Sequence, residues 1–153
     1  MDQQITPVIV TLTSYARGER GEKENLIQLI CHGKLKKVSS GYLLRYVEVQ
    51  TDDQTGESMA QEVMLQLQQG RVSMTRMGEF GTTMVFVKDR RFEGVYHTPY
   101  GDLAMALYAV QVQTALQDDH GSIHLEYQLD MQGGYAPMQC IDMSYCLEGM
   151  RVC

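Results

Sequence analysis

The side chains most able to do chemistry in this sequence are histidines near turns and charged residues inside apolar rows. His97 stands beside a turn at residues 98–101 and is flanked by Tyr96 and Tyr100, where an imidazole could act as an acid or a base. A histidine at such a turn more commonly hydrogen-bonds a turn carbonyl. We therefore expect a structural role for His97.

His120 and His124 have the spacing of two metal ligands on one face of a helix. The residues that follow alternate between apolar and polar types, which predicts a strand and separates the two histidines by about 13 Å. We expect two solvated histidines at the start of a strand and no metal site.

Glu48 and Arg76 each end an otherwise apolar row of alternating residues, so the period of two directs both side chains inward. An unpaired buried charge is costly, and we expect the two to pair with each other or with another buried polar group. Alternatively, both strands end before these positions and the charged groups reach water. If buried, the pair is either a structural strut or the polar anchor of a ligand cavity.

Tyrosine and methionine side chains could also line a binding site. A tyrosine ring with its polar hydroxyl suits the mouth of a barrel, although most tyrosines should be core or rim residues. The count of 11 methionines suits a core that needs gap filling and, less commonly, a promiscuous apolar cavity. The candidate ligand-binding residues are Tyr46, Glu48, Arg76, Tyr96, His97, Tyr100 and Tyr127.

Signatures of several enzyme classes are missing from the sequence. It contains no Gly-x-x-x-x-Gly-Lys, no Gly-x-Gly-x-x-Gly after a strand and no Gly-x-Ser-x-Gly. We therefore assign no catalytic residue, no metal ligand and no cofactor. An acid–base enzyme stays open but unsupported, because the sequence places no pair of carboxylates across a cleft.

The elements that must position these residues are strands. Turn residues at 52–56, 78–81 and 132–134 interrupt alternating apolar rows along the whole chain. The pattern predicts one all-β domain over residues 1–153, with about eight to ten antiparallel strands in a sandwich or an up-and-down barrel. A closed barrel is favoured because it removes sheet edges, and few of these strands carry charged edge protection. Gly33 is a candidate β-bulge. The expected strands are residues 5–16, 26–35, 42–49, 59–68, 72–76, 84–88, 90–96, 103–116, 123–130 and 141–147.

Residues 103–116 fit two structures. Their first half has a helical apolar stripe through Leu103, Leu107 and Val110, with Asp102 as N-cap. Their second half alternates with period two. The residues alone favour a strand over a helix.

Composition and charge limit the partners. The net charge of −6 and the pI of about 5.1 argue against nucleic acid and anionic membranes. Residues 1–4 are polar and resemble no signal peptide, so we expect a cytoplasmic protein with four free thiols. Cys140 and Cys146 would lie about 20 Å apart on one strand, too far for a disulfide.

Four segments of the sequence match one known family in order and spacing. They are Tyr46 with Glu48, Arg76-Met77-Gly78, Thr98-Pro99-Tyr100-Gly101-Asp102-Leu103, and Gly121-Ser122-Ile123-His124-Leu125-Glu126-Tyr127. Together they resemble the YwiB-like family of uncharacterised bacterial proteins. The resemblance implies a lipocalin-like (calycin-type) barrel and a strand over residues 103–116. It implies no activity and transfers no catalytic residue.

Three functions are compatible with the predicted barrel. The first is a non-catalytic barrel that binds a small apolar or amphipathic ligand near its open end. The second is a filled barrel that acts through its outer surface as a protein-interaction or oligomerisation module, for example a homodimer. The third is an enzyme that works from the region of Tyr96, His97, Tyr100, Glu48 and Arg76.

Overall fold

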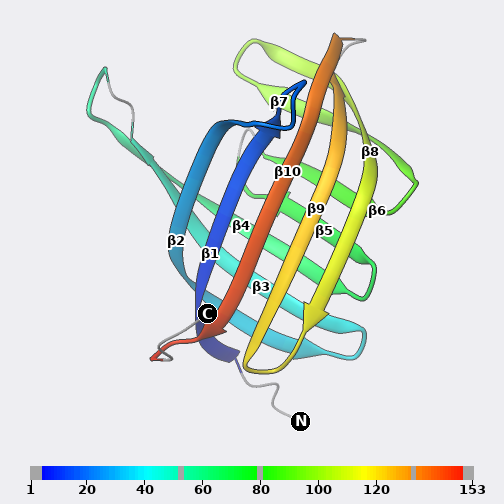
Figure 1. Cartoon of the computed structure of the whole chain (residues 1–153). Coiled ribbons are helices and arrows are strands. Elements are labelled where there is room, and N and C mark those ends of the chain that lie inside the picture. Colours follow the sequence, from blue (N-terminus) through cyan, green and yellow to red (C-terminus); the bar gives the residue numbers. More distant parts are fainter. Residues whose placement is uncertain (1–4, 52–53, 79–80, 132–133, 150–153) are drawn as a thin grey trace.

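Strands make up every regular element of the computed structural model, which describes residues 5–51, 54–78, 81–131 and 134–149 (Figure 1). Residues 52–53, 79–80 and 132–133, which are parts of the turns expected at 52–56, 78–81 and 132–134, lie outside these ranges, as does the polar start at 1–4. Within them there is no helix, and hence none long and apolar enough to cross a membrane. The strands are β1 (Ile5–Arg17), β2 (Lys23–Val38), β3 (Gly41–Thr51), β4 (Ser58–Gln68), β5 (Arg71–Arg76), β6 (Thr82–Val87), β7 (Arg91–Thr98), β8 (Gly101–Leu116), β9 (His120–Met131) and β10 (Gly134–Leu147).

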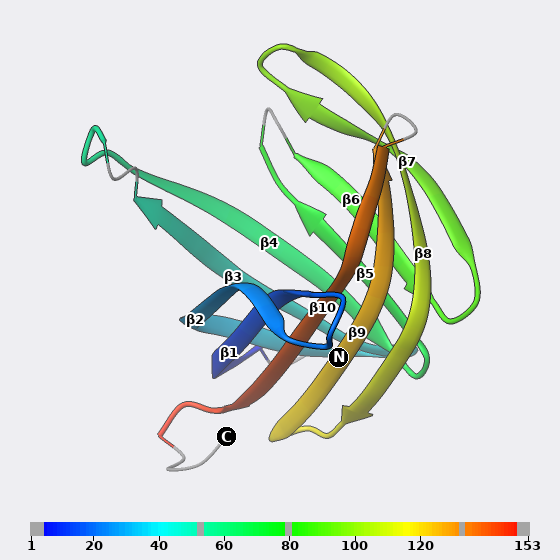
Figure 2. The ribbon, with the colours of Figure 1, turned by 45° about the horizontal axis from the view of Figure 1, so that its top comes forward.

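The strands form one antiparallel sheet in the order β6-β5-β4-β3-β2-β1-β10-β9-β8-β7. The first and last strands of the chain pair with each other, so the sheet curls into a nearly closed barrel (Figures 1 and 2). This confirms the predicted antiparallel all-β fold. The two edge strands of the sheet, β6 and β7, meet at a seam that has no ladder in the described residues. At this seam the Thr82 hydroxyl donates a hydrogen bond to the carbonyl of Val95 at 3.3 Å.

The inward rows that the alternation predicts line the interior. Phe86 and Tyr127 meet edge to face across it, with ring centroids 5.0 Å apart. Four methionines are buried in this core, as expected of side chains that fill irregular space. They are Met74, Met84, Met105 and Met143.

The ambiguous residues 103–116 belong to strand β8, as the resemblance implied. The strand pairs with β7 on one side and β9 on the other, so both halves are fixed by ladders. A tight turn at Pro99 and Tyr100 joins β7 to β8, and the Tyr100 amide donates to the hydroxyl of Thr98 at 3.2 Å. Strand pairing on both sides therefore outweighs the helical spacing of apolar residues in the first half of the segment.

Gly33 is not a bulge, contrary to the sequence prediction. It pairs regularly with Val8 on one side and Tyr46 on the other. A Cβ there would lie 2.9 Å from the carbonyl oxygen of Arg45, so the glycine permits close approach of two strands. The irregularity of β2 lies instead near Asn25, whose φ is 54°.

Strands β2 and β3 part beyond this glycine. Their ladder joins Gly33–Val38 to Gly41–Tyr46 and goes no further in the described residues. From there β2 continues beside β1 alone, and β3 beside β4 alone. The β3–β4 hairpin therefore projects away from the barrel (Figures 1 and 2).

The expectation of four free thiols is wrong, because Cys146 is disulfide-bonded. Cys31 and Cys140 are free, so the excluded pairing of Cys140 with Cys146 does not occur.

Gly121 gives a direct test of the packing. A Cβ at this position would overlap the ring of Tyr145, which is fully buried and donates from its hydroxyl to the carbonyl of Gln117 at 2.7 Å. We expect Gly121→Ala to lower the free energy of unfolding by about 1–3 kcal/mol through overpacking. Urea denaturation measures this, with the exposed neighbour Ser122→Ala as control. Equal stability of the two variants would show that the Tyr145 ring can move aside.

Candidate functional site

A polar cluster lies inside the barrel near the parting of β2 and β3. Tyr46 and Arg76 flank Val63 in one inward row across β3, β4 and β5, and Glu48 lies two residues further along β3. The Arg76 Nε is 3.5 Å from Glu48 Oε2, which confirms the predicted pairing. The Glu48 side chain is 4% exposed and that of Arg76 is 29% exposed, so only the carboxylate is fully removed from water.

Tyr46 is the unusual member of this cluster. Its side chain is buried, and its hydroxyl makes no hydrogen bond of ordinary distance and angle among the described residues. Burial, then the charge of Glu48 and a weaker, poorly aligned approach of the hydroxyl to the Glu48 carboxylate, raise the pKa of the Tyr46 phenol. Burial and the Glu48 charge also raise the pKa of the partly buried Cys31 thiol. The cluster therefore contains an uncharged hydroxyl able to donate a hydrogen bond.

Tyr127 of β9 is a buried residue close enough to the cluster for the charge of Arg76 to act on its phenol. Burial raises its pKa to about 12, and the charge of Arg76 acts in the opposite direction. Its ring also packs on Phe86. The structure thus brings together four of the seven predicted residues, Tyr46, Glu48, Arg76 and Tyr127.

The other three predicted residues lie on the β7–β8 hairpin. Tyr96 follows Val95, whose carbonyl contacts β6, and its ring is partly exposed near the seam. His97 and Tyr100 are exposed. The Nδ1 of His97 lies 2.8 Å from the Asp102 carboxylate, so its partner is a side chain and not the turn carbonyl that we expected. The ladder pairs His97 with Asp102 directly across the hairpin, which explains the difference.

The Glu48–Arg76 pair should respond asymmetrically to substitution. Arg76→Met leaves a buried carboxylate without its cation, and we expect a loss of about 3–5 kcal/mol of stability. Glu48→Gln leaves a guanidinium that already reaches water, and the loss should be smaller, about 1 kcal/mol. Urea denaturation of the two variants at pH 7 compares these values. Equal losses would mean that Glu48 is as well hydrated as Arg76.

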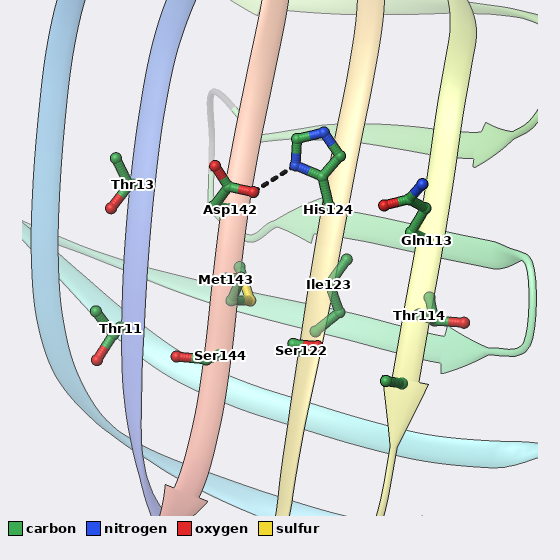
Figure 3. Close-up of a pocket in the computed structure, with 11 residues that line it drawn as sticks. Thr11, Thr13, Gln113, Thr114, Ser122, Ile123, His124, Asp142, Met143 and Ser144 are labelled. Atoms are coloured by element: carbon green, nitrogen blue, oxygen red, sulfur yellow. Dashed lines mark hydrogen bonds and ion pairs between the residues drawn. The ribbon is translucent and has the colours of Figure 1, made fainter. Parts of the chain in front are cut away.

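A second polar region lies on the outer face of β1, β10, β9 and β8 (Figure 3). A groove of about 500 Å³ is lined there by short polar side chains in two transverse rows. The register places Thr11 beside Ser144 and Ser122 in one row, and Thr13 beside Asp142, His124 and Gln113 in the other.

His124 is held between two carboxylates in this region. Its Nδ1 contacts Asp142, and its Nε2 lies 3.1 Å from Glu126 Oε1 (Figure 3 shows the first contact). Arg17 Nη2 binds the same Glu126 oxygen at 3.0 Å, and the Tyr15 hydroxyl donates to Asp142 at 3.3 Å. His124 is therefore not the freely solvated histidine that we expected. No three His, Cys, Asp or Glu side chains of the described ranges are placed to hold a metal ion.

Sequence reasoning missed this network because its parts come from three strands. Alternation places His124 and Glu126, two residues apart on β9, on one face. Asp142 comes opposite His124 through the β9–β10 register, and Tyr15 approaches Asp142 through the β1–β10 register. A pairing register does not follow from the pattern of one strand.

The network predicts a pH-dependent stability. Burial lowers the pKa of His124, but hydrogen bonds to Asp142 and Glu126 and the charges of both carboxylates outweigh it, so the pKa is raised. The raised pKa means that protonated His124 stabilises the fold fully below its unfolded pKa of about 6.5, and that this contribution is lost as pH rises through the folded value. The difference in unfolding free energy between wild type and His124→Gln should therefore shrink from pH 6 to pH 9.

Urea denaturation across that range measures this difference. His120→Gln, which removes a histidine whose side chain is mostly exposed, is the control for loss of an imidazole. A wild-type advantage over His124→Gln that stays constant or grows with pH would contradict the proposed protonation.

Comparison with known proteins supports the fold and names no activity. The family described as "Domain of unknown function (DUF1934)" matches residues 10–143. The crystal structure of ywiB protein from Bacillus subtilis is similar with a TM-score of 0.72 at 18% identity, over 95% of this chain and 94% of that one. No curated protein matches the chain significantly.

Proposed function

The chain belongs to the family described as a domain of unknown function (DUF1934), and from that premise we propose that it is a non-catalytic module that binds a small amphipathic molecule. The proposed site is the cluster of Tyr46, Glu48, Arg76 and Tyr127. The observation that carries the proposal is the buried Tyr46 hydroxyl without a partner. A buried polar group left unpaired costs free energy, and a ligand that accepts its hydrogen bond would recover it.

Other buried tyrosines support this interpretation by contrast. Tyr42 and Tyr145 pack together near the loop between β8 and β9, with ring centroids 6.4 Å apart. Their hydroxyls bind Asp118 and the carbonyl of Gln117. These two hydroxyls are paired, whereas the hydroxyl of Tyr46, next to an ion pair, is not.

The charges of the cluster limit the ligand head group. Glu48 already neutralises Arg76, so an anionic head would leave the buried cluster with an uncompensated negative charge. Tyr46 and Arg76 both donate hydrogen bonds. We therefore expect an uncharged head that accepts hydrogen bonds, such as an alcohol, ester or amide.

An apolar body would contact the inner face of β2. Leu29 and Cys31 belong to that face and are only partly buried, because β3 no longer runs beside this part of β2. Covering partly exposed apolar surface is favourable at roughly 25 cal/mol per Å². The ligand class is therefore an uncharged amphipath.

Three probes of equal length test this proposal. Octan-1-ol should shift the amide resonances of Leu29, Cys31 and Glu48 in a ¹H–¹⁵N NMR titration. Octanoate and octylamine should bind about tenfold more weakly or not at all, because each adds an unpaired charge. Tyr46→Phe should abolish the response while raising unfolding stability by about 1 kcal/mol, since it removes an unpaired buried hydroxyl.

The control substitution is Tyr108→Phe, which removes a partly exposed hydroxyl on β8 and should leave binding intact. Equal shifts with octan-1-ol in wild type and Tyr46→Phe would rule out the site. Native mass spectrometry of protein from its natural host would then identify any molecule bound elsewhere.

A further inference from the structure

The edge of β2 that faces away from β1 is open beyond the β2–β3 ladder. In the described ranges, residues 23–32 have β1 as their only strand neighbour. Several exposed large hydrophobic residues border this opening, and Ile30 is 77% exposed. Those on the adjoining strands are Leu26, Ile27 and Ile30 of β2, Val47 and Val49 of β3, and Met59 of β4.

This edge lacks the features that keep free strands apart. Residues 26–31 read Leu-Ile-Gln-Leu-Ile-Cys and contain no charge, proline or glycine. Natural edge strands are usually blocked by charged residues, proline, bulges or a covering segment. A strand with high β-propensity and no charge pairs readily with another chain. The edge therefore requires a cover.

We propose that the cover is a second copy of this chain, through antiparallel pairing of β2 with β2 about a two-fold axis. The usable edge is limited at one end by the irregularity at Asn25 and at the other by Gly33, where β3 occupies the edge. The midpoint of residues 26–32 is Leu29. A two-fold axis must place the same residue opposite itself, so Leu29 lies on the axis.

This register is complementary along its length. It places Gln28 opposite Ile30 of the second copy and Ile27 opposite Cys31, so no like charges face each other. Just beyond the shared ladder, Glu24 of one copy approaches Lys34 of the other, and the symmetry repeats this opposite-charge contact at the far end. The β3–β4 hairpin diverges from β2 and leaves the edge accessible (Figures 1 and 2).

The register allows a charge-swap experiment on the full chain. Gln28 and Ile30 are both exposed, so charged replacements should leave the fold intact. Wild type should sediment as a dimer. The double variant Q28K/I30K places lysine opposite lysine in two symmetric pairs and should raise the dimer Kd by about a hundredfold or more. The double variant Q28K/I30E places opposite charges in the same pairs and should restore the dimer.

Sedimentation equilibrium measures the three proteins, and far-UV circular dichroism checks that each is folded. Tyr100→Lys, at an exposed position on a distant hairpin, is the control and should stay dimeric. A wild type that stays monomeric at all protein concentrations would overturn the proposal. This holds even if a different protein covers the edge, because the proposal requires a second copy of this chain. A dimer that survives in Q28K/I30K, or a folded Q28K/I30E that stays monomeric, would overturn the interface or its register.

Discussion

Strands β2 and β3 share a ladder only as far as Gly33 and Tyr46, and both proposed binding surfaces depend on this parting. The last rung requires glycine, because a side chain at Gly33 would collide with the Arg45 carbonyl. Beyond it each strand follows its other neighbour, since those ladders continue. On the outside the parting leaves a strand edge open. On the inside it leaves Leu29 and Cys31 incompletely covered beside the polar cluster.

The polar cluster is a stability cost that the barrel does not need. Moving a carboxylate from water into a protein interior costs several kcal/mol, and the attraction to Arg76 offsets only part of it. Arg76 keeps contact with water, so the pair avoids the full cost of removing two ions from solvent. The Tyr46 hydroxyl has no such compensation, and a phenyl ring in its place would be more stable. Residues that break the rules of core packing in this way are expected where binding competes with stability.

Alternation in the sequence was sufficient for the strands and for the inward direction of Glu48 and Arg76, because side-chain direction depends only on the period of two. Alternation was not sufficient to predict the order of the strands in the sheet. Nothing in the pattern of β6 and β7 places the seam between them, since that depends on which ladders close first. Likewise His124 meets Asp142 only through the β9–β10 register, and His97 meets Asp102 only through the β7–β8 hairpin. Apart from the Glu48–Arg76 pair, which the cost of a buried charge made predictable, the contacts between strands were the part that the sequence left undetermined.

His124 and His97 are poorly placed for general-base catalysis. A general base needs a ring nitrogen free to take a proton from a substrate. Both nitrogens of His124 face carboxylates, and its raised pKa favours the protonated form, which has no free nitrogen lone pair. His97 lies on an exposed hairpin, where a substrate would stay surrounded by water. The cluster inside the barrel contains no histidine, and its ion pair is neutral as a whole. The cluster has a hydroxyl and a guanidinium that can donate hydrogen bonds beside apolar surface, as the proposed ligand site requires.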